Sequence, residues 1–403
     1  MNAHFRFLCS LLAIGVLVGC TSPRERVAYH RIDDLLTRPA VASNEWSVLI
    51  TDRKGNVRYQ KNPLTPSVPA SNEKLFTVSG AFGLLGTNHS FETRIYFDGL
   101  LADGILKGDV NLVCEHDITW NPAVFPSNAG APLQHIAERL KAKGLKSIEG
   151  KVQCYGACFY NPDGNARMHD PQNQAEYNRR AAIAFKNALS ANGVEVSTNA
   201  PAGAAGFTAP GSLFYTHQSA DMLFDGKPLN LQTAVIPLLK HSENVMADGL
   251  LRHTGFRMRG EDSYSAGAIA EGEWLSRTAK IDTNGLSISD GSGLSREDAC
   301  SAAQVISLLR YMLKNYPALA PALPISCTDG TLVHRFCGTE AAGKVHAKTG
   351  TLRVCAALSG YVADTNGAPR YLFSFIANNR RSIDLTLARQ TIDEAVTQLA
   401  VQH

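Results

Sequence analysis

The stretch Pro69-Ala-Ser-Asn-Glu-Lys74 leads into a segment that we expect to form a helix over residues 71–85, closed by Gly86. Ser71 and Lys74 are one helical turn apart, so their side chains share a face. A serine hydroxyl attacks poorly unless a base takes its proton, and lysine can be that base once burial lowers its pKa. A helix cap followed by a solvated lysine would give the same letters, so this pair needs support from elsewhere in the chain.

Two later segments supply that support. Ser242-Glu-Asn244 interrupts two apolar helical stretches, whereas Ser190-Ala-Asn192 and Ser197-Thr-Asn199 fall at an expected helix end and in a loop. Lys348-Thr-Gly-Thr351 enters a β-rich segment, whereas His253-Thr-Gly255 ends an expected helix. On an edge strand, Lys348 and Thr349 would bind a carboxylate, and backbone N–H groups would face an oxyanion.

Strand patterns occur towards both ends of the chain, with helical patterns between them. The strands are expected at residues 46–51, 57–60, 344–352, 356–363 and 371–377, before a last helix at 385–400. Residues 88–231 differ, with short β-like segments and many Gly, Asn and Pro residues. This arrangement predicts an α+β domain of residues 46–87 and 232–403, interrupted by an inserted mixed α/β domain of residues 88–231.

The N-terminus has the features of an export signal. The apolar run from Phe7 to Val18 is too short to span a bilayer, which takes about 20 residues. It ends in Leu17-Val-Gly-Cys20, which resembles a bacterial lipobox, although an ordinary secretory signal with a chance cysteine is an alternative. We expect a lipoprotein signal peptide over residues 1–19, lipid on Cys20, and a tether over residues 20–45 with one short helix around Asp33 to Thr37. The protein would then face the periplasm, and Thr21 favours the outer over the inner membrane.

Composition excludes several classes of protein. The chain has 403 residues, 44% apolar and 19% charged, with a net charge of +3. These values exclude a disordered chain and a protein that binds nucleic acid through bulk charge. Of nine cysteines, seven remain once Cys9 and Cys20 are set aside, so disulfides and at least one free thiol are expected after export. Their spacing leaves the pairing open and predicts no metal site.

The ordered set Ser-x-x-Lys, Ser-x-Asn and Lys-Thr-Gly occurs in serine β-lactamases and penicillin-binding proteins. With its flanking stretches, the chain resembles the D-alanyl-D-alanine carboxypeptidase/endopeptidase family, the class C low-molecular-mass penicillin-binding proteins of the type of penicillin-binding protein 4. The resemblance covers residues 46–86 and 233–378 well and the insertion loosely. The further stretches that carry it are Asp290-Gly-Ser-Gly-Leu-Ser-Arg296, Asp329-Gly-Thr-Leu332, Gly343-Lys-Val-His-Ala-Lys-Thr-Gly-Thr-Leu352 and Leu358-Ser-Gly-Tyr361.

The resemblance implies a fold, an activity and a set of roles. The fold would be the penicillin-binding-protein/serine β-lactamase-like transpeptidase fold, an antiparallel sheet flanked by helices. The activity would be serine-type D-Ala-D-Ala carboxypeptidase on peptidoglycan stem peptides, with β-lactams as covalent inhibitors and no metal or cofactor; endopeptidase action stays open. The implied roles are Ser71 as nucleophile, Lys74 as its base, Ser242 as proton relay to the leaving amine, Asn244 as amide ligand, Lys348 and Thr349 as carboxylate ligands, and the backbone N–H groups of Ser71 and Thr351 as oxyanion hole.

The sequence also departs from the family. Glu243 is larger than usual within its motif, and the insertion is shorter than in three-domain members, which suggests that one accessory domain is absent. Cys114-Glu-His-Asp117 replaces a Gly-rich stretch, and Tyr155 stands near an Asp associated with recognition of the peptide stem. For the turn at residues 290–296 we expect a structural role.

Three alternatives accompany this interpretation. A β-lactamase or esterase on the same fold would need a group that activates water for rapid deacylation, and the sequence shows no dedicated carboxylate for it. A peptidoglycan-binding lipoprotein with a relict site is the non-enzymatic alternative. His241 and His346, beside the motifs, are alternative bases.

Overall fold

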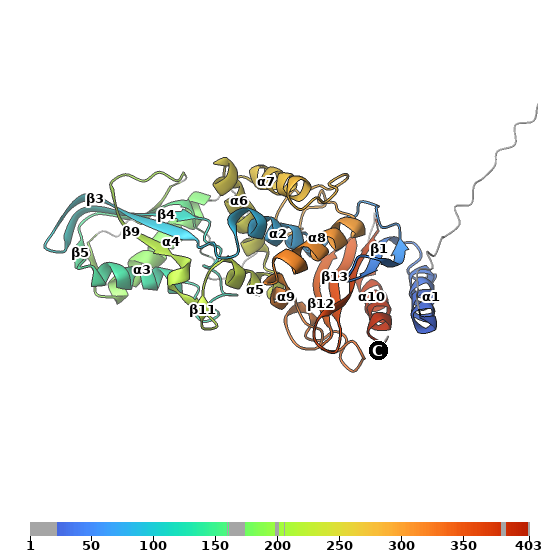
Figure 1. The fold of residues 1–403 in the computed structure, drawn as a ribbon. Coiled ribbons are helices and arrows are strands. Elements are labelled where there is room, and N and C mark those ends of the chain that lie inside the picture. The colour runs from blue at the N-terminus through green and yellow to red at the C-terminus, as the bar shows by residue number, and fades with distance from the viewer. Residues whose placement is uncertain are drawn as a thin grey trace, which may run out of the picture.

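The computed structural model describes residues 22–158, 160, 174–197, 201–204, 206–379 and 384–401. The chain forms two bodies side by side along one long axis (Figure 1). One is a helix-covered sheet built from both ends of the chain, and the other is built from its middle. The expected signal peptide, residues 1–19, and the expected lipidation site, Cys20, lie outside the described residues. Within the described ranges, no helix is both long and apolar enough to cross a membrane.

The first body contains a five-stranded antiparallel sheet with the order β12-β13-β14-β1-β2. The chain's beginning and end meet in it, because Glu45 of β1 pairs with Asn378 of β14. Strand β13 is buried at every position, since helices cover both faces of the sheet. The strands are β1 (Glu45–Asp52), β2 (Val57–Lys61), β12 (Val345–Leu352), β13 (Cys355–Ala363) and β14 (Pro369–Asn378).

The two faces of this sheet carry separate cores. In β1, Val48 belongs to the core that α1 and α10 cover, whereas Leu49 belongs to the core beneath α2, α5, α6 and α8, as expected from the alternation of side chains along a strand. The helices of this body are α1 (Pro23–Thr37), α2 (Glu73–Leu85), α5 (Leu231–His241), α6 (Asn244–Arg259), α7 (Tyr264–Arg277), α8 (Ala302–Asn315), α9 (Leu319–Ala322) and α10 (Leu385–Ala400).

Helix α1 corrects the predicted tether. The expected helix covers only residues 33–37, but the observed helix begins at Pro23, ends at Thr37 and lies beside α10 (Figure 1). Arg38 pairs with Glu394 of α10 at 2.8 Å, and the Tyr371 hydroxyl donates to Glu25 at 2.6 Å. Apolar side chains of α1, Ile32 among them, are buried against the sheet. Most of this segment is therefore part of the folded body.

The second body is built within residues 92–218, inside the segment that the sequence analysis assigns to an insertion. Its sheet is mixed: β3 pairs antiparallel with β4 and β9, whereas β5 and β6 run parallel to β4. It has its own apolar core, to which Trp120 and Phe185 belong. Its elements are β3 (Glu92–Ala102), β4 (Ile105–Glu115), α3 (Ala131–Ala142), β5 (Ser147–Ile148), β6 (Val152–Ala157), α4 (Gln174–Ala191), β7 (Glu195–Val196), β8 (Ala202–Gly203) and β9 (Ser212–Gln218); the hairpin of β10 (Leu223–Phe224) and β11 (Lys227–Pro228) leads back to the first body.

The cysteines divide between bonded and free forms. Cys114 at the end of β4 is joined to Cys158 beyond β6, and Cys327 is joined to Cys337 in the loop before β12. Cys154, Cys300 and Cys355 are free and buried. Two disulfides and free thiols agree with the expectation for an odd number of cysteines.

Candidate active site

The candidate nucleophile and base lie at the start of α2. Ser71 sits in the short 3-10 turn η1 (Ala70–Asn72), and Lys74 lies one turn further along the chain. Lys74 Nζ is 3.0 Å from Ser71 Oγ, within hydrogen-bond distance. The one-turn spacing therefore produces the contact that nucleophilic catalysis by serine requires.

Lys74 is enclosed by the other motifs. It is fully buried, and its Nζ also donates to Asn244 Oδ1 at 2.7 Å and to the Ser292 carbonyl at 2.6 Å. Burial lowers the pKa of Lys74 to about 8, against the opposing effects of the Asp248 and Asp290 carboxylates. A lysine with this pKa is partly neutral near pH 8 and can accept a proton.

The Ser242 motif forms the corner between α5 and α6. Ser242 adopts the left-handed conformation, with φ of 61°, which ends α5 and turns the chain into α6. Its Oγ accepts a hydrogen bond from Lys348 Nζ at 2.8 Å. Asn244 is the first residue of α6, and its side chain reaches Lys74. The break seen in the sequence thus directs Ser242 and Asn244 towards the same centre as Lys74.

Strand β12 closes the site from the sheet side. It is the edge strand, and Lys348 on it is fully buried with its Nζ on Ser242 Oγ and on the Thr349 carbonyl. Burial, reinforced by Lys74, lowers the pKa of Lys348 well below its usual value. At Gly350, a Cβ atom would stand 2.6 Å from the Pro69 carbonyl. Glycine at this position therefore allows β12 to pass close to the turn that carries Ser71.

The turn at residues 290–296 holds the base in place. The carboxylate of Asp290 accepts the backbone N–H groups of Ser292 at 2.9 Å and Gly293 at 2.6 Å. This directs the Ser292 carbonyl at Lys74. A Cβ at Gly293, whose φ is 79°, would stand 2.0 Å from the Ala70 carbonyl. The structural role expected for this turn includes a direct contact with Lys74, which the sequence did not predict.

The motifs open onto a cavity of about 300 Å³. Ser71, Ser242, Thr349 and Thr351 line it, and Lys74, Asn244 and Lys348 lie behind them, so all seven predicted site residues meet. Three further lining residues were not predicted: Thr331, Arg335 and Arg389. Of these three, Thr331 could have been found in the sequence, because it lies in one of the stretches that carry the resemblance. In the structure its Oγ1 lies 2.9 Å from Thr349 Oγ1.

Comparison with known proteins identifies the family. The model of the D-Ala-D-Ala carboxypeptidase 3 (S13) family matches residues 28–213 and 172–400. The chain belongs to this family. Its enzyme class is therefore the expected one, a serine-type D-Ala-D-Ala carboxypeptidase.

Members and structures of the S13 family align with most of the chain. D-alanyl-D-alanine carboxypeptidase of Actinomadura sp. (strain R39) is 26% identical over 453 residues, covering 89% of this chain and 82% of the relative. Carboxypeptidase Rv3627c of Mycobacterium tuberculosis is 34% identical over 371 residues, covering 82% and 75%. Penicillin binding protein 4 (dacB) from Haemophilus influenzae superposes with a TM-score of 0.70 at 21% identity, over 92% of this chain and 98% of that one. This superposition confirms the expected fold.

The second body touches the first through residues at and just beyond the end of β4. His116 Nε2 lies 2.6 Å from the Asp262 carboxylate, and Glu115 pairs with Arg257 at 3.2 Å. Phe207 of the insertion stacks on Phe256 of α6, with 4.3 Å between the ring centres. Residues 115–116, where a departure from the family was expected, thus form part of the junction between the two bodies.

Of the two alternative bases, His346 is engaged elsewhere. The ring of His346 stacks on Tyr361 with 4.7 Å between the centres, and burial lowers the pKa of His346. Within the described part of the chain, the hydrogen bond to Ser71 Oγ comes from Lys74. This geometry favours lysine as the base of the S13 site.

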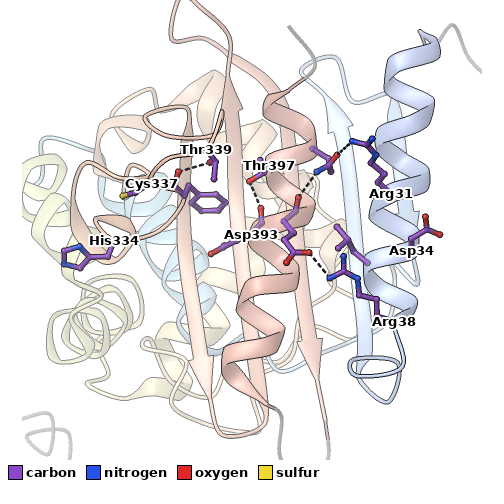
Figure 2. A pocket seen from close by; sticks show the side chains of 12 residues that line it. Arg31, Asp34, Arg38, His334, Cys337, Thr339, Asp393 and Thr397 are labelled. Atoms are coloured by element: carbon purple, nitrogen blue, oxygen red, sulfur yellow. Dashed lines mark hydrogen bonds and ion pairs between the residues drawn. The ribbon is translucent and has the colours of Figure 1, made fainter.

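A larger hollow, of about 510 Å³, lies between α1, α10 and the loop of the second disulfide (Figure 2). Arg31 and Arg38 extend from α1 towards α10, where they bond to Gln398 at 3.4 Å and Glu394 at 2.8 Å. Cys337 on its rim is held in a disulfide. None of its lining residues pairs a nucleophile with a base, in contrast to Ser71 and Lys74 at the smaller cavity.

Proposed function

We propose that the protein removes the terminal D-alanine from peptidoglycan stem peptides through an acyl-enzyme on Ser71. The observation that carries this proposal is the 3.0 Å contact between Ser71 Oγ and the buried Nζ of Lys74. Neutral Lys74 takes the hydroxyl proton, and Ser71 Oγ attacks the carbonyl carbon of the scissile amide. The backbone N–H groups of Ser71 and Thr351 stabilise the oxyanion.

The remaining residues guide the leaving group. Lys348 donates to Ser242 Oγ, so the hydroxyl hydrogen of Ser242 is free to point into the cavity towards the amine that departs. As the amide bond breaks, Ser242 gives its hydroxyl proton to the departing amine and receives in its place the proton that Lys74 took from Ser71. Asn244 uses its Oδ1 on Lys74, which leaves its Nδ2 donors for a substrate carbonyl. Water then releases the acyl group from Ser71.

The decisive experiment is intact-mass spectrometry of the protein from residue 22 onward with excess benzylpenicillin, followed by peptide mapping. We expect a stable adduct on the Ser71 peptide and release of D-alanine from a peptide ending in D-Ala-D-Ala. Ser71→Ala abolishes both without lowering the melting temperature, whereas Ser307→Ala, at an exposed position of α8, changes neither. Acylation retained in Ser71→Ala would refute the assignment.

The other outcomes separate the alternatives. Destruction of the drug without an adduct, together with fast nitrocefin turnover, would indicate a β-lactamase. An intact drug without an adduct, together with stem-peptide binding that Ser71→Ala leaves unchanged, would indicate a binding protein. Digestion of cross-linked muropeptide dimers distinguishes endopeptidase action, the activity named for the Bdellovibrio bacteriovorus neighbour Bd3459, a Predatory Peptidoglycan Endopeptidase.

We also propose that the protein is an exported lipoprotein that faces the periplasm, held preferentially in the outer membrane through Cys20. The lipobox-like stretch before Cys20 supports this, as do two disulfides, which persist in oxidising compartments. The mature protein made from the full chain should lack residues 1–19 and carry acyl groups on its N-terminal cysteine. An unmodified N-terminus, or membrane association retained by Cys20→Ser, would contradict the anchor.

A further inference from the structure

Helix α10 places Arg389, a residue that belongs to none of the sequence motifs, at the catalytic cavity. Arg389 lines the cavity with Ser71 and Thr349, and its Nη2 donates to Thr351 Oγ1 at 2.8 Å. The hydrogen bond holds the guanidinium beside the residue whose backbone N–H is assigned to the oxyanion hole. The side chain is exposed, so a ligand entering the cavity can reach it.

The two arginines that line the cavity differ in whether a carboxylate pairs with them. Arg335, the other arginine in the lining, pairs with Asp393 through both carboxylate oxygens. Across the described ranges, no carboxylate forms an ion pair with Arg389. Its hydrogen bond goes to the neutral hydroxyl of Thr351, while its charge acts on the Asp393 carboxylate without direct bonding. Arg389 therefore presents a positive charge at the cavity to which no carboxylate is directly bonded, whereas the charge of Arg335 is largely neutralised by Asp393.

Lys348 is less able to meet a substrate carboxylate directly. Its side chain is fully buried, and its Nζ already donates to Ser242 Oγ at 2.8 Å and to the Thr349 carbonyl at 2.9 Å. Only one of its three N–H bonds is left for another partner. The arrangement suits Lys348 to orient Ser242, and it leaves the exposed arginine as the cation that an incoming anion contacts.

We propose that Arg389 is a specificity residue that binds the free carboxylate of the residue that leaves, together with the hydroxyl groups of Thr349 and Thr351. This inference rests on the proposed function. A guanidinium offers paired N–H groups that match the two oxygens of a carboxylate, and one side of Arg389 stays open when the other bonds to Thr351. The preferred substrates are then acyl donors with a free terminal carboxylate, and the same donors capped as amides are poor substrates.

The test compares two substrates that differ only at this group: an acyl-D-Ala-D-Ala peptide and its C-terminal carboxamide. In Arg389→Gln, kcat/KM for the acid should fall about ten- to a hundredfold, as expected for one lost charge-assisted hydrogen bond, while kcat/KM for the amide stays within about twofold. Arg389→Lys should recover part of the loss. Arg38→Gln, an exposed arginine on the far side of α10, is the matched control and should leave the acid-to-amide ratio unchanged.

A second measurement does not depend on turnover of a peptide. Benzylpenicillin carries a free carboxylate and its methyl ester does not, so acylation by the acid should slow in Arg389→Gln while acylation by the ester does not. Equal losses on both members of either pair, or no loss on either, would overturn the role of Arg389. If neither compound acylates the wild-type protein, the proposed function is overturned instead. The two failures are therefore distinguishable.

Discussion

At the scale of single residues, the environment of Lys74 determines when the site can react. Ser71 and Lys74 were evident in the sequence as a spacing, but the spacing alone does not distinguish a base from a solvated lysine. The distinction comes from burial and from Asn244 and Ser292, which reach Lys74 from distant parts of the chain.

The pKa of Lys74 leads to a pH profile. The base acts only when neutral, and burial lowers the pKa of Lys74 to about 8. The rate constant for acylation by benzylpenicillin should therefore rise about tenfold per pH unit below pH 8 and level off above it. Stopped acylation reactions between pH 6 and 9.5, counted by intact mass, measure this profile. A midpoint of the profile near pH 10.5, the ordinary pKa of lysine, would show that burial does not lower the pKa of Lys74.

Other residues of the site could not be predicted individually. Arg389 is an exposed arginine on an amphipathic helix, and in a sequence such a residue is indistinguishable from a solvated surface charge. Its role arises only because α10 packs on β13, the neighbour of the edge strand β12, and brings Arg389 to Thr351. Arg335 could not be predicted either, because its ion-pair partner Asp393 lies on α10, far from it in the sequence.

At the scale of elements, the sequence predicted most of the catalytic body. The last helix spans Leu385–Ala400 and the edge strand ends at Leu352, both as expected. Helix α1 was underestimated even though Ser22 and Glu25 form a capping box and Pro23 occupies the first turn. That signal was present, but the polar surroundings concealed it.

The approach of β12 to η1 gives a prediction at this scale. A Cβ added at Gly350 would lie 2.6 Å from the Pro69 carbonyl, so Gly350→Ala must push the strand away from Ser71. We expect acylation to fall at least about tenfold with a loss of about 1–3 kcal/mol in stability, typical of overpacking. Gly272→Ala on α7, where a Cβ would meet no atom within 4 Å, is the control and should keep wild-type acylation. Melting curves measure the loss of stability, and time courses with benzylpenicillin measure the acylation rate. Unchanged acylation in Gly350→Ala would contradict the close approach of β12 to η1.

At the scale of the whole molecule, the junction between the two bodies makes stability depend on pH. His89 Nε2 lies 2.8 Å from His253 Nε2, and His116 lies beside them. Burial lowers the pKa of all three, that of His89 to about 4. The three rings therefore take up protons at a lower pH in the folded protein than in the unfolded chain, where histidine titrates near pH 6.5.

It follows that the unfolded state binds more protons below pH 6.5, and the free energy of unfolding falls as the pH is lowered from about 6.5 towards about 4. Each group contributes a slope of up to about 1.4 kcal/mol per pH unit. Chemical denaturation at several pH values should show this decline, and His253→Gln should make it shallower. His30→Gln, at an exposed position of α1, should leave the slope unchanged. An unaltered slope in His253→Gln would contradict this account of the junction.

We propose that residues 88–231 fold as a unit of their own, and the disulfide between Cys114 and Cys158 provides the test. A link between residues 44 apart stabilises by about 4 kcal/mol in the chain-entropy treatment. Replacing both cysteines by serine should speed hydrogen exchange within the insertion while acylation of Ser71 persists. The matched pair is Cys327 and Cys337, whose loss should loosen the catalytic body instead. Faster exchange spread over both bodies would argue against separate units.

The start of α1 has a consequence for how far the enzyme reaches. Only Thr21 and Ser22 separate Cys20 from Pro23, and even a fully extended chain covers no more than about 11 Å over that interval. Because α1 is docked on α10, a lipid on Cys20 would hold the catalytic body against the bilayer surface. Such an enzyme trims only the layer of wall adjoining its own membrane, and its working zone follows the spacing between that membrane and the peptidoglycan.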